Sequence, residues 1–202
     1  MGAGALTAGF FGFRFRLPFA KGILMAKRKS KKQAKPAAAA ASDLENRLYL
    51  ELEGGRVVID LRPDLAPNHV ARIKALAREH FYDGIAFHRV IPGFMAQTGC
   101  PHGTGTGGSG QKLRAEFNAE PHVRGICSMA RAQDPDSADS QFFIVYDTTP
   151  HLDRQYTVWG KVVSGMELID AVKSGAPGSG TVRDPDKIKS LSVAADIEGA
   201  KA

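Results

Sequence analysis

The sequence predicts a mainly β domain, a closed antiparallel barrel with two helices packed on it, which follows a basic tail. Three observations support this fold class. Short apolar runs of β character recur along the chain, two stretches show helical periodicity, and closely spaced glycines and prolines separate the runs. The length of 202 residues suits one domain with a hydrophobic core.

Cysteine content and hydropathy exclude two classes of protein. Two cysteines cannot build a disulfide framework, and no uncharged apolar run approaches the ~20 residues that a bilayer span needs. The net charge of +6 is unevenly distributed, because the first 42 residues contain nine basic and no acidic side chains, whereas the remaining 160 contain 18 basic and 21 acidic ones. A tail of +9 therefore precedes a domain of −3.

Residues 1–42 have the composition of a disordered tail. The lysine-rich block at residues 27–35 repels itself, and residues 37–41 are all alanine. We interpret residues 1–24 as a start-site extension, because Met25 followed by Ala26 and this block is typical of the start of a cytosolic protein; a transit peptide is the alternative. We expect a cytoplasmic protein whose folded domain spans residues 43–202.

Two antiparallel strands open the predicted domain. Leucines alternate with polar or amphipathic residues from Arg47 to Glu53, and aliphatic residues alternate with Arg56, Val58 and Asp60 up to Leu61. The Gly54-Gly55 pair between the two runs is typical of a two-residue hairpin, because primed turns need positive φ.

Helical periodicity follows at two places, one beginning at Pro67 and the other near Met166, and Gly175 is expected to end the second helix. The apolar faces consist of Val70, Ile73 and Ala77 in the first helix and of Met166, Ile169 and Val172 in the second. Further β-like runs occur at residues 86–90, 141–145, 157–163 and 188–194.

Three familiar kinds of site have little support. Segment 103–110 matches G-x-G-x-x-G twice, but no helical period follows it and Lys112 follows Gln111, so we interpret it as a flexible surface loop. The sequence has no His-x-x-x-His, Cys-x-x-Cys or Gly-x-Ser-x-Gly pattern, which removes the main support for metal or covalent catalysis. Cys127 lies in an apolar run and is interpreted as a core residue.

Three strings are more informative: Phe-His-Arg-Val-Ile-Pro-Gly-Phe-Met-Ala-Gln at 87–97, Ser-Met-Ala-Arg-Ala at 128–132 and Ser-Gln-Phe-Phe-Ile-Val at 140–145. Taken alone, they offer one cation, Arg89, with two amides, Gln97 and Gln141, among aromatic and methionine side chains. Periodicity by itself favours the simpler interpretation, in which the apolar residues fill a barrel core and Arg89 is solvated.

Together with the Gly-Thr-Gly-Gly loop and Leu152, these strings resemble the cyclophilins in order and approximate spacing, over about residues 47–196. The resemblance implies an eight-stranded antiparallel barrel capped by two helices, and peptidyl-prolyl cis-trans isomerase activity without a cofactor or metal. It implies that Arg89 is the catalytic side chain and that Gln97 contacts the peptide and helps hold Arg89. The implied substrate-binding residues are Phe94, Met95, Gln97, Ala130, Arg131, Ala132, Gln141, Phe143, His151, Leu152 and Tyr156, of which Phe94, Met95, Phe143 and Leu152 would line the proline pocket.

Three positions depart from the best-known eukaryotic pattern of that family. His151 stands where many members carry the Trp that recognises cyclosporin, Tyr156 replaces a His, and Arg131 replaces an Asn. Tyr and a replaced Trp are familiar in bacterial-type members, so the resemblance still implies isomerase activity. We expect cyclosporin binding to be weak.

The leading hypothesis is a monomeric isomerase that assists folding by acting on X-Pro bonds in peptides and unfolded proteins. The alternative is a proline-peptide binding or chaperone module without significant turnover, against which the intact Arg89 argues. A third hypothesis, nucleic-acid binding through residues 27–35, rests on charge alone. We expect no membrane partner.

Overall fold

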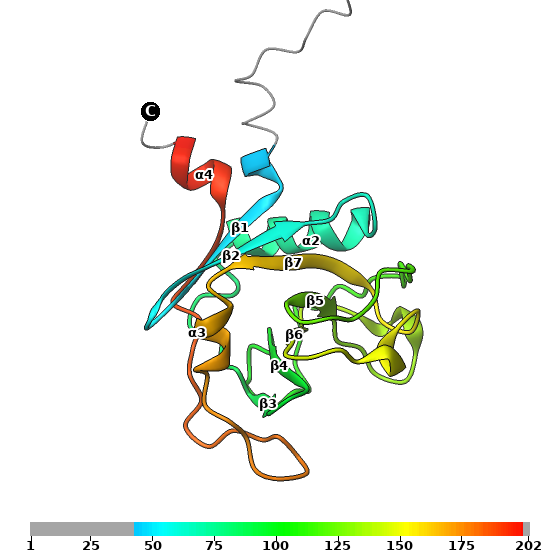
Figure 1. Ribbon diagram of the computed structural model, residues 1–202. Helices are drawn as coiled ribbons and strands as arrows, with labels where there is room; N and C mark the ends of the chain where they lie inside the picture. Colours follow the sequence, from blue (N-terminus) through cyan, green and yellow to red (C-terminus); the bar gives the residue numbers. More distant parts are fainter. Residues whose placement is uncertain (1–42, 200–202) are drawn as a thin grey trace, which may run out of the picture. The chain divides into compact units, whose positions relative to one another are not determined.

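The computed structural model describes residues 43–199, and the predicted disordered tail at residues 1–42 lies outside this range. The described chain forms one eight-stranded antiparallel sheet that curls around a hydrophobic core (Figure 1), which confirms a mainly β fold. The strands are β1 Arg47–Leu52, β2 Gly55–Leu61, β3 Arg89–Ile91, β4 Met95–Thr98, β5 Ile126–Met129, β6 Phe142–Val145, β7 Val158–Ser164 and β8 Ser190–Val193.

The sheet is open, so the predicted closed barrel is wrong. The strand order is β3-β4-β6-β5-β7-β2-β1-β8, and within residues 43–199 no ladder joins the edge strands β3 and β8. Two isolated bridges, Ala86 with Lys187 and Arg89 with Thr181, link the β3 edge to the chain before β8. Closure needs a continuous register between the edges, but β3 has three residues and glycines and prolines interrupt the stretch 174–186.

Strands β1 and β2 form the predicted hairpin. Every second residue from Leu48 onward in β1 and from Val57 onward in β2 is buried, as the alternation predicts. The turn is Glu53-Gly54 rather than Gly54-Gly55, because Leu52 pairs with Gly55. Gly55 has a φ of 138° and starts β2, so the positive φ lies in the strand and not inside the turn.

Helix α2, Pro67–Arg78, begins where the sequence predicts it, and proline suits the first helical position because no N–H is needed there. The helix packs on β7 and β8 through a buried face. The buried residues are His69, Val70, Ile73, Leu76 and Ala77. None of the helices at residues 43–199 is both long and apolar enough to cross a membrane.

The second helix is shorter than predicted. Helix α3 covers Met166–Asp170, and Gly175 does not end it. Gly175 instead donates its N–H to the Val90 carbonyl at 2.9 Å and lies against Gly180, where a side chain would collide with the backbone. The chain after α3 therefore continues along the β3 edge rather than as a helix.

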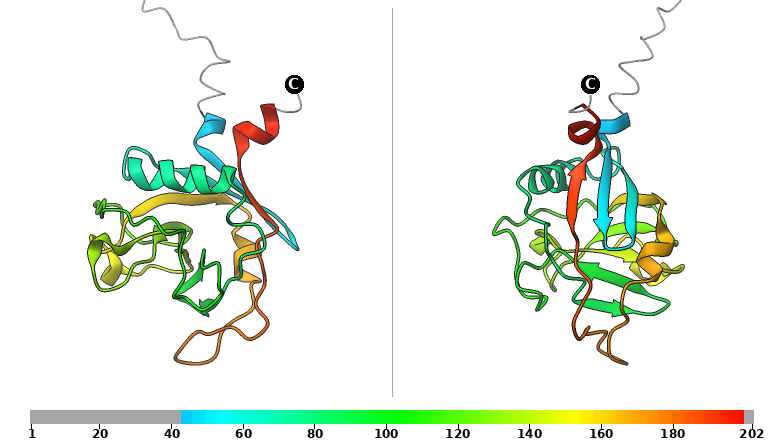
Figure 2. Two further views of the ribbon diagram at one scale, coloured as in Figure 1. Left: turned by 180° about the vertical axis from the view of Figure 1, so that it is seen from behind. Right: turned by 90° about the vertical axis from the view of Figure 1, so that its left-hand side faces the viewer.

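Several elements were not predicted. Helix α4, Ala194–Gly199, follows β8 directly and lies near the start of β1 (Figure 2), where Asp196 accepts a hydrogen bond from Arg78 of α2 at 2.9 Å. The four predicted β-like runs overlap β3, β6, β7 and β8, whereas β4 and β5 were missed. Two 3₁₀ turns, Pro135–Ser137 and Pro150–Leu152, were also missed.

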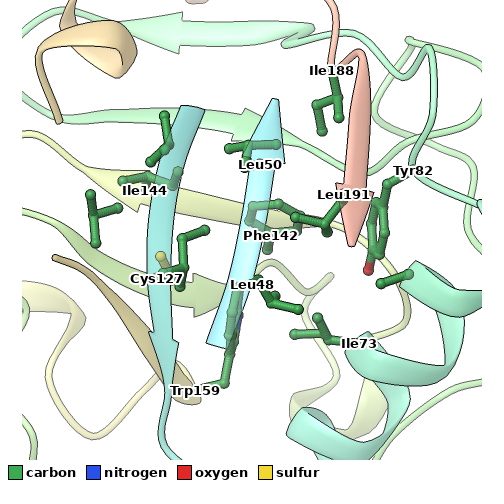
Figure 3. Packing of buried hydrophobic residues seen from close by; sticks show 14 of the residues in the cluster. Leu48, Leu50, Ile73, Tyr82, Cys127, Phe142, Ile144, Trp159, Ile188 and Leu191 are labelled. Carbon is green, nitrogen blue, oxygen red and sulfur yellow. The ribbon is translucent and has the colours of Figure 1, made fainter. Parts of the chain in front are cut away.

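Buried apolar residues form two clusters on opposite faces of β4, β5 and β6. The larger, here called the core cluster, contains Leu48, Ile73, Phe142 and Trp159 and includes Cys127 as predicted (Figure 3). The smaller, here called the site cluster, contains Met95, Ile126, Phe143, Val145, Leu152 and Val158. Adjacent residues of β6 enter different clusters because side chains alternate across a strand.

Candidate active site

The site cluster forms the floor of a hollow of about 130 Å³, here called the first hollow. The structure brings together nine of the twelve residues that the resemblance to the cyclophilins pointed to. The lining consists of Arg89, Phe94, Met95, Gln97, Ala130, Arg131, Phe143, Leu152 and Tyr156. Ala132 and Gln141 do not line it, and neither does His151, which is exposed and lies beside Phe94 with the ring centroids 5.5 Å apart.

Strand register assembles the key side chains. Arg89 pairs with Gln97 across β3 and β4, Gln97 pairs with Phe143 across β4 and β6, and Phe143 pairs with Ser128 across β6 and β5. Directly opposed residues project to the same face of a sheet, so four residues from four strands form one row. Phe94 lies in the turn between β3 and β4, where its N–H bonds to the Ile91 carbonyl at 3.0 Å.

Arg89 carries a half-buried guanidinium at the edge of the first hollow. Its Nε donates to the Ser179 carbonyl at 3.1 Å, and its Nη1 donates to Gln97 Oε1 at 3.4 Å. Both acceptors are neutral, and no carboxylate within residues 43–199 forms an ion pair with it. The positive charge is therefore held in place without being neutralised.

The floor of the first hollow is apolar, and its side chains are almost inaccessible to solvent. Met95, Phe143 and Leu152 are 1%, 5% and 6% exposed, respectively. Phe143 packs edge-on against Tyr156 with ring centroids 5.6 Å apart. Such a surface binds a small apolar ring by removing it from water.

Arg131 lies at the rim and is braced by neutral groups. Its guanidinium lies 4.8 Å from the centroid of the Tyr156 ring and donates to the carbonyls of Gln155, Ala132 and Gln133 at 3.1, 2.9 and 3.2 Å. The arginine at this position thus shapes the wall rather than forming an ion pair among the described residues.

A buried polar group under the floor was missed by sequence reasoning. His122 Nδ1 lies 2.9 Å from Asp153 Oδ1, His122 Nε2 lies 3.1 Å from Ser128 Oγ, and the imidazole stacks on Phe143. Burial lowers the pKa of His122 despite the opposing effect of Asp153, and hydrogen bonds from His122 lower the pKa of Asp153. Sequence reasoning missed this contact because His122 and Asp153 are 31 positions apart in the chain.

Ser128, His122 and Asp153 are the residue types of a serine-hydrolase triad, but the serine hydroxyl is not accessible to a substrate. Ser128 is fully buried, and its hydroxyl donates to the Thr157 carbonyl at 2.9 Å. A nucleophile must reach substrate and be activated by a base, and neither condition holds here. The three residues support Phe143 from below.

A second hollow of about 420 Å³ adjoins the first and shares Gln97, Ala130 and Arg131 with it. The predicted site residues Ala132 and Gln141 line this second hollow, together with residues 105–108 of the glycine-rich segment 103–110. No helix follows the loop within residues 111–125, which confirms that it lacks the geometry of a dinucleotide-binding fingerprint. Among residues 43–199, no group of three His, Cys, Asp or Glu could hold a metal ion.

Comparisons with known proteins agree with this geometry. Residues 47–193 match the family described as cyclophilin type peptidyl-prolyl cis-trans isomerase/CLD. A probable peptidyl-prolyl cis-trans isomerase of Brucella suis is 54% identical over 173 residues, which cover 79% of this chain and 88% of that protein. Peptidyl-prolyl cis-trans isomerase B of Bacillus subtilis is 48% identical over 129 residues, which cover 63% of this chain and 90% of that protein.

Solved structures show the same relationship. A cyclophilin-type peptidyl-prolyl cis-trans isomerase of Cryptosporidium parvum, crystallised in the presence of the dipeptide Ala-Pro, aligns with a TM-score of 0.68 and 30% identity, covering 73% of this chain and 98% of that one. The fold and these relatives define the class of protein as an enzyme, a peptidyl-prolyl cis-trans isomerase. Within that class, the chain belongs to the cyclophilin-type family.

Proposed function

We propose that this chain interconverts the cis and trans forms of X-Pro bonds in peptides and unfolded proteins, and that Arg89 is its catalytic residue. The observation that carries the proposal is an Arg89 guanidinium free of any carboxylate in the described chain, held at the edge of an apolar hollow the size of one small ring. The Cryptosporidium parvum structure obtained in the presence of Ala-Pro supports a proline-containing ligand for such a site.

The chemistry explains why a cation is needed. Resonance in the X-Pro amide creates a rotation barrier of ~18–20 kcal/mol, so the isomers exchange in tens to hundreds of seconds. In the twisted transition state the proline nitrogen becomes pyramidal and regains a lone pair that the planar amide lacks. A hydrogen bond from Arg89 to that nitrogen stabilises the transition state and not the ground state, which is the condition for catalysis.

Arginine suits this role because its guanidinium stays charged and carries several N–H groups on one plane. A charge-assisted hydrogen bond is worth about 1.5–3 kcal/mol, which corresponds to roughly a ten- to hundredfold rate increase. No proton is transferred and no covalent bond breaks.

The apolar floor provides the second contribution. Met95, Phe143 and Leu152 hold the proline ring, with Phe94 beside them, while the preceding carbonyl rotates. The bound ring on this apolar floor would also exclude water that stabilises the planar, more polar amide. Gln97 holds Arg89 from the adjacent strand.

The remaining site residues contact the rest of the peptide. Ala130, Arg131 and Ala132 form the rim along which its backbone runs, and Tyr156 closes the wall through its contact with Phe143. His151 shapes the outer wall from its exposed position next to Phe94. An imidazole in this place is smaller than an indole, which is the basis for expecting weak cyclosporin binding.

The test is turnover of a prolyl tetrapeptide by the wild-type protein, by Arg89→Ala and by Arg183→Ala. Arg183 is exposed and serves as a matched arginine outside both hollows. We expect the wild type and Arg183→Ala to accelerate isomerisation equally and Arg89→Ala to lose about ten- to hundredfold. A wild-type rate equal to that of buffer would refute the proposal, and undiminished turnover by Arg89→Ala would refute the role of Arg89.

A further inference from the structure

The glycine-rich loop at residues 103–107 is held in place although it has no apolar anchor of its own. Its residues are exposed or half-buried, and Gly103 and Gly105 have φ values of 64° and 85°. A segment of this composition loses much conformational entropy when it is ordered, so specific contacts must compensate.

Those contacts converge on the sulfur of Cys100. Cys100 is fully buried, and its Sγ accepts hydrogen bonds from the backbone N–H groups of Gly105 at 3.2 Å and Gly107 at 3.3 Å. Burial raises the pKa of this thiol, but the backbone N–H groups of Gly107, Gly105, Thr104 and His102 together outweigh burial and hold the pKa below its usual value. The geometry therefore makes this sulfur the acceptor that holds the backbone of the loop.

The same two glycines face Gln141 with their carbonyls. Gln141 Nε2 donates to the Gly105 carbonyl at 2.9 Å and to the Gly107 carbonyl at 2.7 Å. Both protons of the amide are used, so the orientation of the Gln141 side chain is set by the loop and its Oε1 points the other way.

From Gln141 the contacts continue to the proposed catalytic residue. Gln97 Nε2 donates to Gln141 Oε1 at 3.0 Å, which turns Gln97 Oε1 toward Arg89 Nη1 at 3.4 Å. Because a guanidinium can only donate, Arg89 needs this oxygen and not the amide nitrogen. The hydrogen bonds therefore run in one direction, each group donating to the next, from Arg89 through Gln97 and Gln141 to the loop and finally to Cys100 Sγ. We call this series of hydrogen bonds the relay.

A close backbone contact ties the end of the relay to its middle. Gly99, next to Cys100, has a φ of 85°, and a Cβ there would lie 2.8 Å from the Cα of Gln141. The chain that carries Cys100 therefore packs directly on the backbone of Ser140 and Gln141, which lead into β6.

We propose that the loop at residues 103–107 is a positioning element for Arg89, with Cys100 and Gln141 as its two anchors. The proposal rests on the function proposed for Arg89 and assigns Cys100 a role that neither its burial nor its spacing indicates. Cys100 does not line the first hollow. Replacing Cys100 should therefore change the geometry of the Arg89 guanidinium and leave the surface that holds the proline ring unchanged.

The experiment compares kcat and KM of Cys100→Ala and Cys100→Ser with the wild type on one prolyl peptide. Alanine removes the acceptor for two N–H groups, and we expect kcat to fall about three- to tenfold while KM stays within about twofold. Serine restores an acceptor at shorter reach, so Cys100→Ser is expected to recover part of kcat.

A matched control and a double variant separate positioning from general destabilisation. Cys127→Ala also removes a fully buried thiol, but on the core face of β5, and should lower the melting temperature without changing kcat. Because Cys100 and Gln141 act through the same path, Cys100→Ala combined with Gln141→Ala should be no slower than Gln141→Ala alone.

The proposal is contradicted if folded Cys100→Ala has an unchanged kcat. It is also contradicted if the double variant loses kcat by the product of the two single losses. If Cys100→Ala does not fold, Gln141→Glu decides, because a carboxylate cannot donate to the two loop carbonyls and should reduce kcat in the same way. Absence of wild-type turnover would instead refute the function proposed above, so the two failures are distinguishable.

Discussion

Two neighbouring rows of side chains cross the same strands and have opposite character. One row, Val90, Ala96, Ile144, Cys127 and Gly160, crosses β3, β4, β6, β5 and β7 and is apolar throughout. The adjacent row, Arg89, Gln97, Phe143, Ser128 and Val158, lies one residue away along β3, β4, β5 and β6, and two residues away along β7, where the register shifts; it carries the candidate site. A one-residue slip in register would exchange the two faces, so stability and function depend on the same pairing.

The comparison teaches that the candidate site lies on the face of the sheet that carries the smaller apolar cluster. The core cluster takes in residues from α2 and most strands, whereas the site cluster has six buried members and opens to the hollow. A polar network of Ser128, His122 and Asp153 supports the smaller cluster where apolar packing is limited. Substitutions on the two faces should therefore have separable effects.

The largest expected effect is on stability and comes from the core face. Phe142 is fully buried and packs edge-on against Trp159, with ring centroids 5.3 Å apart. Phe142→Ala leaves a cavity and should lower the free energy of unfolding by about 3–5 kcal/mol, as measured by urea denaturation. A loss below 1 kcal/mol would contradict the assignment of this face to the core.

The neighbouring substitution, Phe143→Ala, should act mainly on binding. Phe143 borders the first hollow, so we expect proline peptides to lose about 1.5–3 kcal/mol of affinity, roughly a ten- to hundredfold weaker Kd, by calorimetry. Its cost in stability should be smaller than that of Phe142→Ala. Equal losses of stability with unchanged peptide affinity would remove the distinction between the faces.

Sequence reasoning predicted the faces of β1 and β2 and the start of α2 because their periodicity is local. It could not predict the row of Arg89, Gln97 and Phe143, which depends on the register of β4 against β6, a strand that lies far along the chain. Resemblance supplied those residues instead. The contact between His122 and Asp153, and the bond between Cys100 and its loop, join segments whose meeting no periodicity indicates.

Two errors have a common physical cause. The closed barrel predicted for the whole domain and the second helix predicted to extend to Gly175 both fail in the chain after α3. Gly175 and Gly180 there approach each other too closely for side chains, and the segment runs along β3 through isolated bridges instead of a ladder or a helix. Close backbone approach depends on tertiary packing and leaves no periodic pattern in the sequence.

Low pH should reduce the stability of the folded domain through its buried histidines, one of which, His122, lies beneath Phe143. Burial lowers the pKa of His122 and His88 below 6.5, so the unfolded chain takes up protons that the folded chain does not. The free energy of unfolding should then decrease as pH falls below about 6.5. Urea denaturation at several pH values checks this, with a shallower slope expected for His122→Gln; stability that rises toward acid would contradict it.

The smallest effect is expected on the solvent-facing side of the hairpin. Arg47 and Asp60 form an ion pair at 2.7 Å with both side chains more than one third exposed. Solvent and salt screen such a pair, so Arg47→Ala should cost about 0.2–1 kcal/mol, and less in high salt. Thermal denaturation at two salt concentrations tests this, and a loss comparable to that of Phe142→Ala would contradict it.

The separation of the two faces is tested most directly by the rate of cis-trans exchange of a proline peptide on the enzyme, measured by NMR for the wild type and Arg89→Ala at saturating protein. We predict that Arg89→Ala lowers this exchange rate about ten- to hundredfold while peptide Kd and the melting temperature stay close to wild type. An unchanged exchange rate on the enzyme, or a loss explained entirely by weaker binding or unfolding, would contradict the account.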